Sequence, residues 1–148
     1  MTAPENPPSL SEEFAELLDE LGVATYDPAG VGGNVFVLGL PADPDLAVRV
    51  ATYAGVESDS KHGYDEPNVQ VWVRGPRGNP VAAERLAQRV YLACHGLRPR
   101  TLPGGTPVLS CIGNQAGPIY VGPDEHGRHE LSVNFRVELR RRGLRNRT

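Results

Sequence analysis

Hydrophobic and polar positions alternate along this chain with two different periods, and each period predicts a different kind of element. Between positions 9 and 22 the apolar residues recur at helical spacing. They are Leu10, Phe14, Leu17, Leu18 and Leu21. Ser9 with Glu12 three residues later forms a capping-box pattern, and Gly22 is placed as a helix stop. These features predict a first helix with one apolar stripe and one acidic face.

A second helix is predicted between Asn79, which can cap its start, and Gly96, which can end it. Pro80 occupies the first helical position, where proline is favoured. The inward stripe is expected to consist of Ala83, Leu86, Val90, Cys94 and Leu97. Cys94 and Cys111 lie far apart in the sequence, so we expect two reduced, buried thiols instead of a disulfide.

A strand is predicted from the short apolar run at 33–41, and further strands are predicted where apolar and polar residues alternate with a period of two. The candidate segments are residues 33–41, 45–55, 67–75 and 108–122, the last with a break near 116–118, whereas residues 98–107 are predicted to be a loop. The final strand alternates with the least ambiguity, and its inward face consists of His129, Leu131, Val133, Phe135, Val137 and Leu139. This order of elements predicts an α+β fold, a mixed and mostly antiparallel sheet with two main helices packed on it.

The domain organisation is expected to be simple. We expect one domain over residues 9–140, a flexible proline-rich segment at 1–8 and a basic tail at 141–148. The segment 55–66 resists assignment, because it is longer than a hairpin connection needs. Loops of that length are commonly functional or disordered.

Charge is distributed unevenly between the two halves of the sequence. Residues 1–66 carry 13 acidic residues against Arg49 and Lys61, which gives −11, and residues 67–148 carry 5 acidic residues against 13 arginines, which gives +8. Two interpretations stay open. One is a domain with two differently charged surfaces, and the other is an acidic face that meets a basic face of the next copy.

The sequence also bears on the compartment of the protein. No apolar run approaches the roughly 20 residues that a membrane helix needs. Residues 1–8 lack the basic start and apolar stretch of a signal peptide. We therefore expect a cytosolic protein without a membrane partner.

Residues 122–142 bring histidines, carboxylates and arginines together, which raises the question of a metal or acid–base site. His126 and His129 are only three residues apart, and no third ligand has a recognisable spacing. Asp124 followed by Gly127 instead predicts a tight turn into the last strand. No serine or cysteine lies in a recognisable nucleophile motif, so nothing in the residues commits the chain to an enzyme, and we expect no metal.

Five arginines lie between residues 140 and 147. Such a cluster can hold phosphate groups by counterion release. It contains no aromatic residue that could stack on a base, and an acidic protein surface would suit it equally well. Nucleic acid and protein therefore both stay open as its partner.

Four pieces of the sequence, taken in their order, resemble the phage minor capsid proteins that act as tail terminators of long-tailed phages. They are "DPDLAVRVATYAG", "PNVQVWVRG", a helix that ends in "HGL", and "GPDEHGRHELSVNF". The resemblance covers roughly residues 10–140 and leaves out the proline-rich start and the arginine tail.

The resemblance implies a structural virion protein of α/β character, for which no catalysis and no cofactor are expected. Its subunits are expected to form a hexameric ring on the head-proximal end of the tail tube, to stop tube polymerisation and to join the tail to the neck proteins. DNA is expected to pass through the ring without sequence-specific binding. The implied location is the virion tail, and the host cytoplasm during assembly.

Contacts with neighbouring subunits or with partner proteins are expected along two connections and the last strand. The residues are Asp59, Lys61, Asp65, Arg74, Asp124, His126, Arg128, Arg136, Glu138 and Arg140. We expect the loop 55–66 or the turn 122–129 to reach a partner ring or the channel. Two alternatives stay open: a head–tail connector or tail-completion subunit, and a nucleic-acid-binding module that uses the arginine tail.

Overall fold

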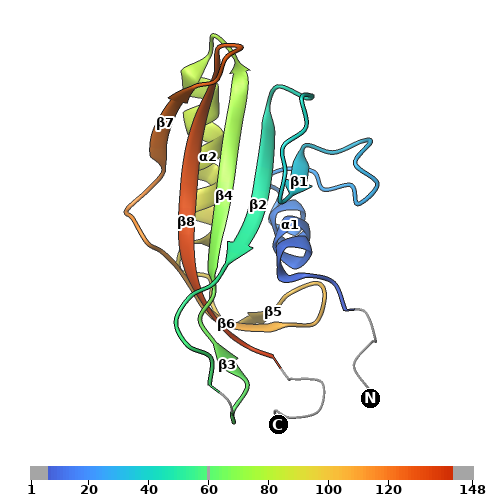
Figure 1. The fold of residues 1–148 in the computed structure, drawn as a ribbon, viewed down its shortest axis with the longest axis vertical. Coiled ribbons are helices and arrows are strands. Elements are labelled where there is room, and N and C mark those ends of the chain that lie inside the picture. The colour runs from blue at the N-terminus through green and yellow to red at the C-terminus, as the bar shows by residue number, and fades with distance from the viewer. Residues whose placement is uncertain (1–6, 60, 142–148) are drawn as a thin grey trace.

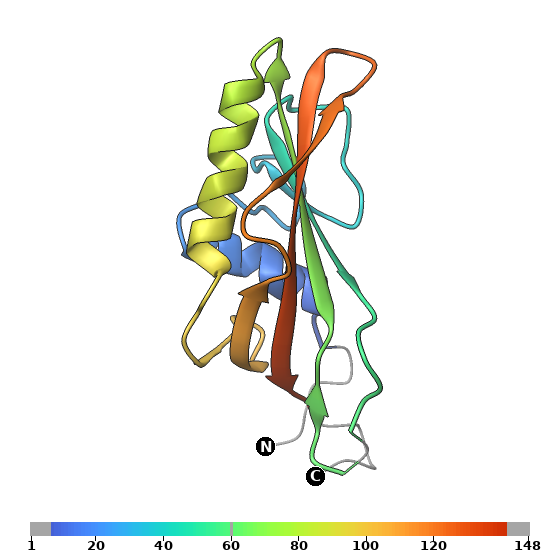
Figure 2. The ribbon, with the colours of Figure 1, turned by 90° about the vertical axis from the view of Figure 1, so that its left-hand side faces the viewer.

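The protein is a layer of two helices on one face of an eight-stranded sheet (Figures 1 and 2). The computed structural model describes residues 7–59 and 61–141. The elements are α1 Leu10–Glu20, β1 Val35–Val37, β2 Ala47–Tyr53, β3 Tyr64–Asp65, β4 Asn68–Arg77, α2 Pro80–Cys94, β5 Arg100–Thr101, β6 Pro107–Gly113, β7 Ile119–Pro123 and β8 Arg128–Arg140. Within these residues, neither helix has the length and apolar character needed to cross a bilayer.

The sheet is mixed and mostly antiparallel, which confirms the predicted fold class. Its strand order is β1-β2-β4-β8-β6-β5, and β3 and β7 both pair with β8. Only the β1–β2 pair among these strands is parallel. α1 contacts β1 and β2, whereas α2 contacts β4, β6 and β8. The opposite face of the sheet carries no helix in the described part of the chain.

The long central strand β8 holds the sheet together. It has 13 residues, and four other strands pair with it. On one side of β8, β4 pairs with its first part and β3 with its last residues. On the other side, β7 pairs with its first part and β6 with its last part. β8 therefore runs the length of the molecule, from the turn at its start to the β3 end (Figure 1).

Both helices start and stop where the sequence predicts. Ser9 Oγ accepts a hydrogen bond from the Glu12 N–H at 3.1 Å, and the Ser9 N–H donates to Glu12 Oε1 at 3.0 Å. Asn79 Oδ1 accepts from the Ala82 N–H at 3.1 Å, which caps α2 in the same way. The predicted apolar stripes are buried, except that Leu21 and Leu97 are only partly covered.

Gly75 lets α2 lie directly on β4. A Cβ atom at this position would stand 2.5 Å from the Cβ of Ala83 on the helix. No real pair of side chains tolerates that distance, so a glycine is needed here for the observed separation of helix and strand. The close approach brings the buried face of α2 onto the valines of β4.

Three expectations about the connections need correction. Leu38 has a positive φ of 69° and ends β1, so the strand expected over 33–41 is only Val35–Val37. The segment 98–107 is not entirely a loop, because β5 pairs with β6. The segment 55–66, which resisted assignment, contains β3, since Tyr64 and Asp65 pair with the end of β8.

Candidate functional site

The ten residues expected at interfaces fall into three groups along β8. Arg74, Asp124, His126 and Arg128 lie at the end where β8 begins, and Asp59, Lys61, Asp65 and Arg140 lie at the end where it finishes. Arg136 and Glu138 lie between the two ends, and their side chains approach to 3.8 Å. Eight of the ten residues therefore lie at two separate ends of the molecule, and the ten do not form one site.

The turn before β8 is closed by Asp124, as the sequence predicts. Asp124 Oδ1 accepts from the N–H groups of His126 at 2.8 Å and Arg128 at 2.9 Å. The Gly127 N–H donates to the Asp124 carbonyl at 3.1 Å, and Gly127 has a φ of +75°, which glycine adopts without strain. The turn thus has a conformation fixed by hydrogen bonds, and Glu125 and His126 are exposed at its tip.

Arg128 is buried and holds this turn against the loop 41–45. Its side chain is only 7% exposed. The guanidinium donates from Nε to Asp124 Oδ2 at 2.8 Å and from Nη1 to the Ala42 carbonyl at 2.6 Å. A further contact joins Nη1 to Asp45 Oδ1 at 3.3 Å. The hydrogen-bonding groups of Arg128 are therefore directed into its own chain.

Arg74 binds the same loop from β4. The residue is 5% exposed. Its Nη2 donates to the Pro41 carbonyl at 2.8 Å and the Pro44 carbonyl at 2.7 Å, and Nε donates to the Asp45 carbonyl at 3.1 Å. Both arginines thus position the loop 41–45. The groups exposed to a partner at this end are those of the loop and of the turn.

The environment of Asp124 favours its ionised form. Desolvation opposes ionisation, but the backbone N–H groups of Arg128 and His126 and the Arg128 guanidinium outweigh it. Together they lower the pKa of Asp124 from 3.8 to about 2. The Asp124 carboxylate in turn raises the pKa of Arg128.

We expect Asp124→Asn to remove part of the acid sensitivity of the fold. The folded-state pKa of Asp124 lies below its ordinary value of 3.8, so the stabilisation is complete above about pH 4 and disappears as the pH falls to about 2. Urea unfolding midpoints at pH 7, 4 and 2.5 should therefore differ between wild type and variant at pH 7 and converge on acidification. Glu125→Gln, at the exposed neighbouring position, should track the wild type throughout. A difference that stays constant with pH would contradict the assignment.

The opposite end of the molecule is built by β3 and its loop. Asp59 Oδ1 accepts from the N–H groups of Lys61 at 2.8 Å and His62 at 2.6 Å, which forms a turn. Asp65 is buried and its Oδ2 accepts from Arg141 Nε at 2.8 Å. Because β3 pairs with β8, the described part of the loop 55–66 is anchored at this end. Residues 142–148, which contain most of the arginine tail, lie outside the described residues.

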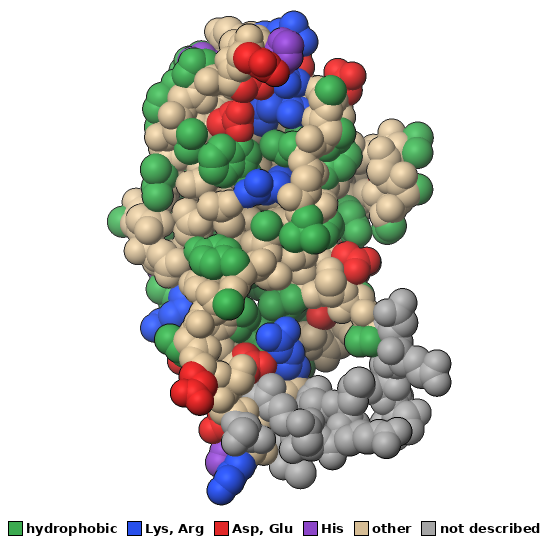
Figure 3. Space-filling view, in the orientation of Figure 1, with side chains coloured by type: hydrophobic (Ala, Val, Ile, Leu, Met, Phe, Trp, Pro, Cys, Tyr) green, Lys and Arg blue, Asp and Glu red, His purple; other side chains and the backbone are tan. Residues whose placement is uncertain are grey.

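Hydrogen-bonded polar side chains lie on the helix-free face of the sheet, which Figure 3 shows as a mixture of apolar, polar and charged groups. Arg49 on β2 donates to Gln70 on β4, and Gln70 Nε2 donates to Asn134 Oδ1 on β8 at 3.2 Å. Trp72 Nε1 donates to Glu130, and the Arg49 guanidinium lies 5.4 Å from the Trp72 ring centroid. Alternation predicts which of these residues share a face, but only the strand register shows that they bind one another.

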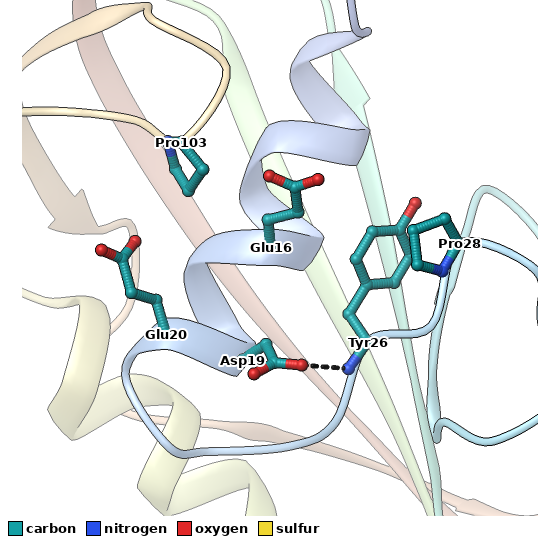
Figure 4. Close-up of a pocket in the computed structure, with 6 residues that line it drawn as sticks. All are labelled: Glu16, Asp19, Glu20, Tyr26, Pro28 and Pro103. Atoms are coloured by element: carbon teal, nitrogen blue, oxygen red, sulfur yellow. Dashed lines mark hydrogen bonds between the residues drawn. The ribbon is translucent and has the colours of Figure 1, made fainter.

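An open hollow of about 400 Å³ lies beside the acidic face of α1. It is lined by Glu16, Asp19, Glu20, Tyr26, Pro28 and Pro103 (Figure 4). Asp19 Oδ2 accepts from the Tyr26 N–H at 2.8 Å, and Glu20 lies 3.4 Å from Arg100 Nη2. Two of the three carboxylates therefore already have partners within the chain. The sequence predicts the acidic face but not the hollow, which depends on the loop that contains Pro103.

The histidines and cysteines do not form a metal-binding group within residues 7–59 and 61–141. No group of three or more His, Cys, Asp and Glu side chains there could hold a metal ion. His129 Nδ1 lies 2.7 Å from the Tyr120 hydroxyl, whereas His126 approaches Glu125. Cys94 and Cys111 are free and buried, as predicted, and burial raises the pKa of Cys111 to about 12.

In this elongated α+β fold, charged side chains hold loops at two opposite ends. A protein-family model described as bacteriophage tail terminator protein matches residues 17–141. The chain belongs to this family, and it is therefore a structural component of a phage tail. No curated protein and no solved structure matches the chain. The family match confirms the resemblance on which the sequence interpretation rested.

Proposed function

We propose that this protein forms a ring at the head-proximal end of the phage tail tube, stops the polymerisation of the tube and joins the tail to the neck. The observation that carries the proposal is the family match over residues 17–141. A terminator needs one surface for the tube and a different surface for the neck. The two ends of the β8 axis provide two such surfaces in each subunit.

The length of β8 separates these surfaces. Its 13 residues, at a rise of about 3.4 Å each, span roughly 40 Å. In a ring whose axis follows the strands, the turn 122–129 and the loop 41–45 would lie on one rim. The loop 55–66 would lie on the other rim. Glu125 and His126 are then the contact residues of the first rim, and Lys61 and Arg140 those of the second.

The polar face of the sheet supports a channel through which DNA passes without sequence-specific binding. Apart from Arg74 and Arg128, which are buried under the loop 41–45, the strand register places Arg49, Arg136, Arg140, Glu130 and Glu138 on this face, and the formal charges of these five residues sum to +1. A face with so small a net charge, on which Arg49 donates to Gln70 and Trp72 donates to Glu130, has little excess positive charge for phosphate, and DNA binding is strongly electrostatic. Such a face would let DNA slide if it lined the channel.

Antibody or gold labelling of this chain on purified tails, followed by negative-stain imaging, tests the proposal. We expect the label at one position, the head-proximal end of the tail. Label along the tube, or particles without label, would contradict the terminator role. In the unlabelled case, DNA binding by the basic tail becomes the function to test, by removing residues 142–148 and measuring the salt dependence of binding.

A further inference from the structure

A projecting loop presents an apolar side chain at the β1 edge of the sheet. Residues 27–33 stand out beyond β1 (Figures 1 and 3); we call them the knob. Val31 in the knob is 87% exposed. The Asp27 carboxylate accepts from the N–H groups of Ala29 at 3.0 Å and Gly32 at 2.9 Å, so the knob has a defined conformation. A protruding loop that has a defined conformation and exposes a valine can contact an apolar patch on another surface.

The other edge of the sheet carries a second apolar feature. Ile119, Tyr120 and Val121 on β7 are 41%, 55% and 52% exposed. β7 pairs with β8 on one side, and no other described strand pairs with its outer side. Consecutive residues of a strand point to opposite faces, so apolar groups flank this edge on both faces. Exposed apolar edge strands tend to associate with other chains.

The knob and the β7 edge lie at the same level along the strand direction, on opposite edges of the sheet. One continuous row of paired residues crosses the sheet and connects Tyr26, Val35, Val48, Val73, Leu131 and Tyr120. Tyr26 stands at the base of the knob, and Tyr120 is the middle apolar residue of the β7 edge. In a ring whose axis follows the strands, features at equal height on opposite edges face one another across each subunit boundary.

The helix layer shows charge complementarity in the same direction. α1 lies on the knob side, and its exposed charged residues Glu12, Glu16, Asp19 and Glu20 carry −4. α2 lies toward the β7 side (Figure 1), and its exposed Glu84 and Arg85, with Arg98 just after the helix, carry +1, whereas Arg89 donates to the Gly22 carbonyl of its own chain. Placing the acidic helix of one copy beside this weakly positive surface of the next is electrostatically favourable.

We propose that neighbouring copies of this chain meet edge to edge, with the knob of one copy on the β7 edge of the next and α1 beside α2. The contact is head-to-tail, because the two patches differ and lie on opposite edges. A two-fold contact would use only one of them and leave the other exposed. Repeated head-to-tail contacts close into a ring when the rotation permits. The inference rests on the proposed ring and names its lateral contact.

Cysteine crosslinking of the variant Val31→Cys/Val121→Cys tests this contact. Both positions are exposed, whereas the native Cys94 and Cys111 are buried and should not react. With a flexible bis-maleimide, the double variant should give a ladder of covalent multimers, in purified protein and in tails assembled from it. A double variant that stays monomeric on denaturing gels in both preparations would overturn the edge contact.

Matched variants distinguish a head-to-tail contact from other arrangements. Each single variant alone should give no dimer, and a mixture of the two should give dimers but nothing larger. Dimers of Val31→Cys alone would indicate a two-fold contact and refute the proposal. Val56→Cys/Val121→Cys places the first cysteine at an exposed valine in the loop 55–66 and should give no ladder.

The same preparations separate this inference from the proposed function. Chain detected at the tail end without a ladder would overturn the edge contact and leave the terminator role intact. A ladder in the purified protein with no chain on tails would support the edge contact and contradict the terminator role.

Discussion

Replacement of Arg74 by methionine is expected to lower the free energy of unfolding by about 2–4 kcal/mol. The guanidinium donates to the carbonyls of Pro41, Pro44 and Asp45 from a buried position on β4. Methionine fills a similar volume but cannot donate these hydrogen bonds. The loop 41–45 then loses one of the two arginines that hold it. Urea unfolding followed by circular dichroism at pH 7 measures the loss.

Arg77→Met is the matched control, because Arg77 lies on the same strand with an exposed side chain. Its ion pair with Asp45 spans 3.6 Å at the surface, where such pairs contribute little. We expect this variant to change stability by less than about 1 kcal/mol. Equal losses for Arg74→Met and Arg77→Met would show that burial of the Arg74 guanidinium does not determine the effect.

Gly75→Ala is expected to destabilise the fold by about 1–3 kcal/mol, although alanine is the smallest possible addition. The new methyl group would stand 2.5 Å from the Ala83 Cβ, so α2 must move away from β4. That movement weakens packing along the buried face of the helix. Thermal and urea unfolding should both show the loss.

Two further variants identify the cause of the Gly75→Ala effect. Gly39→Ala adds the same group where nothing lies within 4 Å and should be close to neutral. Ala83→Gly removes the facing methyl group and should cost about 1 kcal/mol through helix propensity. The double variant Gly75→Ala/Ala83→Gly should lose less stability than the sum of the two single changes. Simple additivity would show that the contact with Ala83 is not responsible.

Local patterns predict most of the elements because their signals lie within a few residues of one another. Ser9 and Glu12 cap α1, and Asn79 caps α2, through atoms three residues apart. The alternation in β8 likewise identifies its buried face, from Leu131 to Leu139. These elements are correct because local preference and the packing of the core agree.

The role of the buried arginines could not be predicted from spacing. Arg128 donates to the carbonyl of Ala42, which lies 86 residues away, and Arg74 donates to Pro41 across 33 residues. Backbone carbonyls are present at every residue, so no sequence signal marks those that accept. The sequence names Arg74, Asp124 and Arg128 only among ten expected contact residues, whereas the structure places all three around one loop.

The short strands in the connecting segments also could not be predicted from the local sequence. A polar sequence such as 55–66 predicts a loop. Tyr64 and Asp65 nevertheless pair with β8, because β8 extends beyond the first residue of β4. β5 forms opposite β6 for a similar reason. Short strands of this kind depend on a partner that is already in place, and their own residues carry little preference.

The position of β8 has a consequence for the timing of folding. β8 is the last strand in the sequence, yet β3, β4, β6 and β7 all pair with it. A nascent chain that ends before Arg128 lacks the pairing partner of these four strands, so the sheet is completed only after β8 has been synthesised. A chain truncated before β8 therefore cannot hold β3, β4, β6 and β7 in one sheet, because their shared pairing partner is missing.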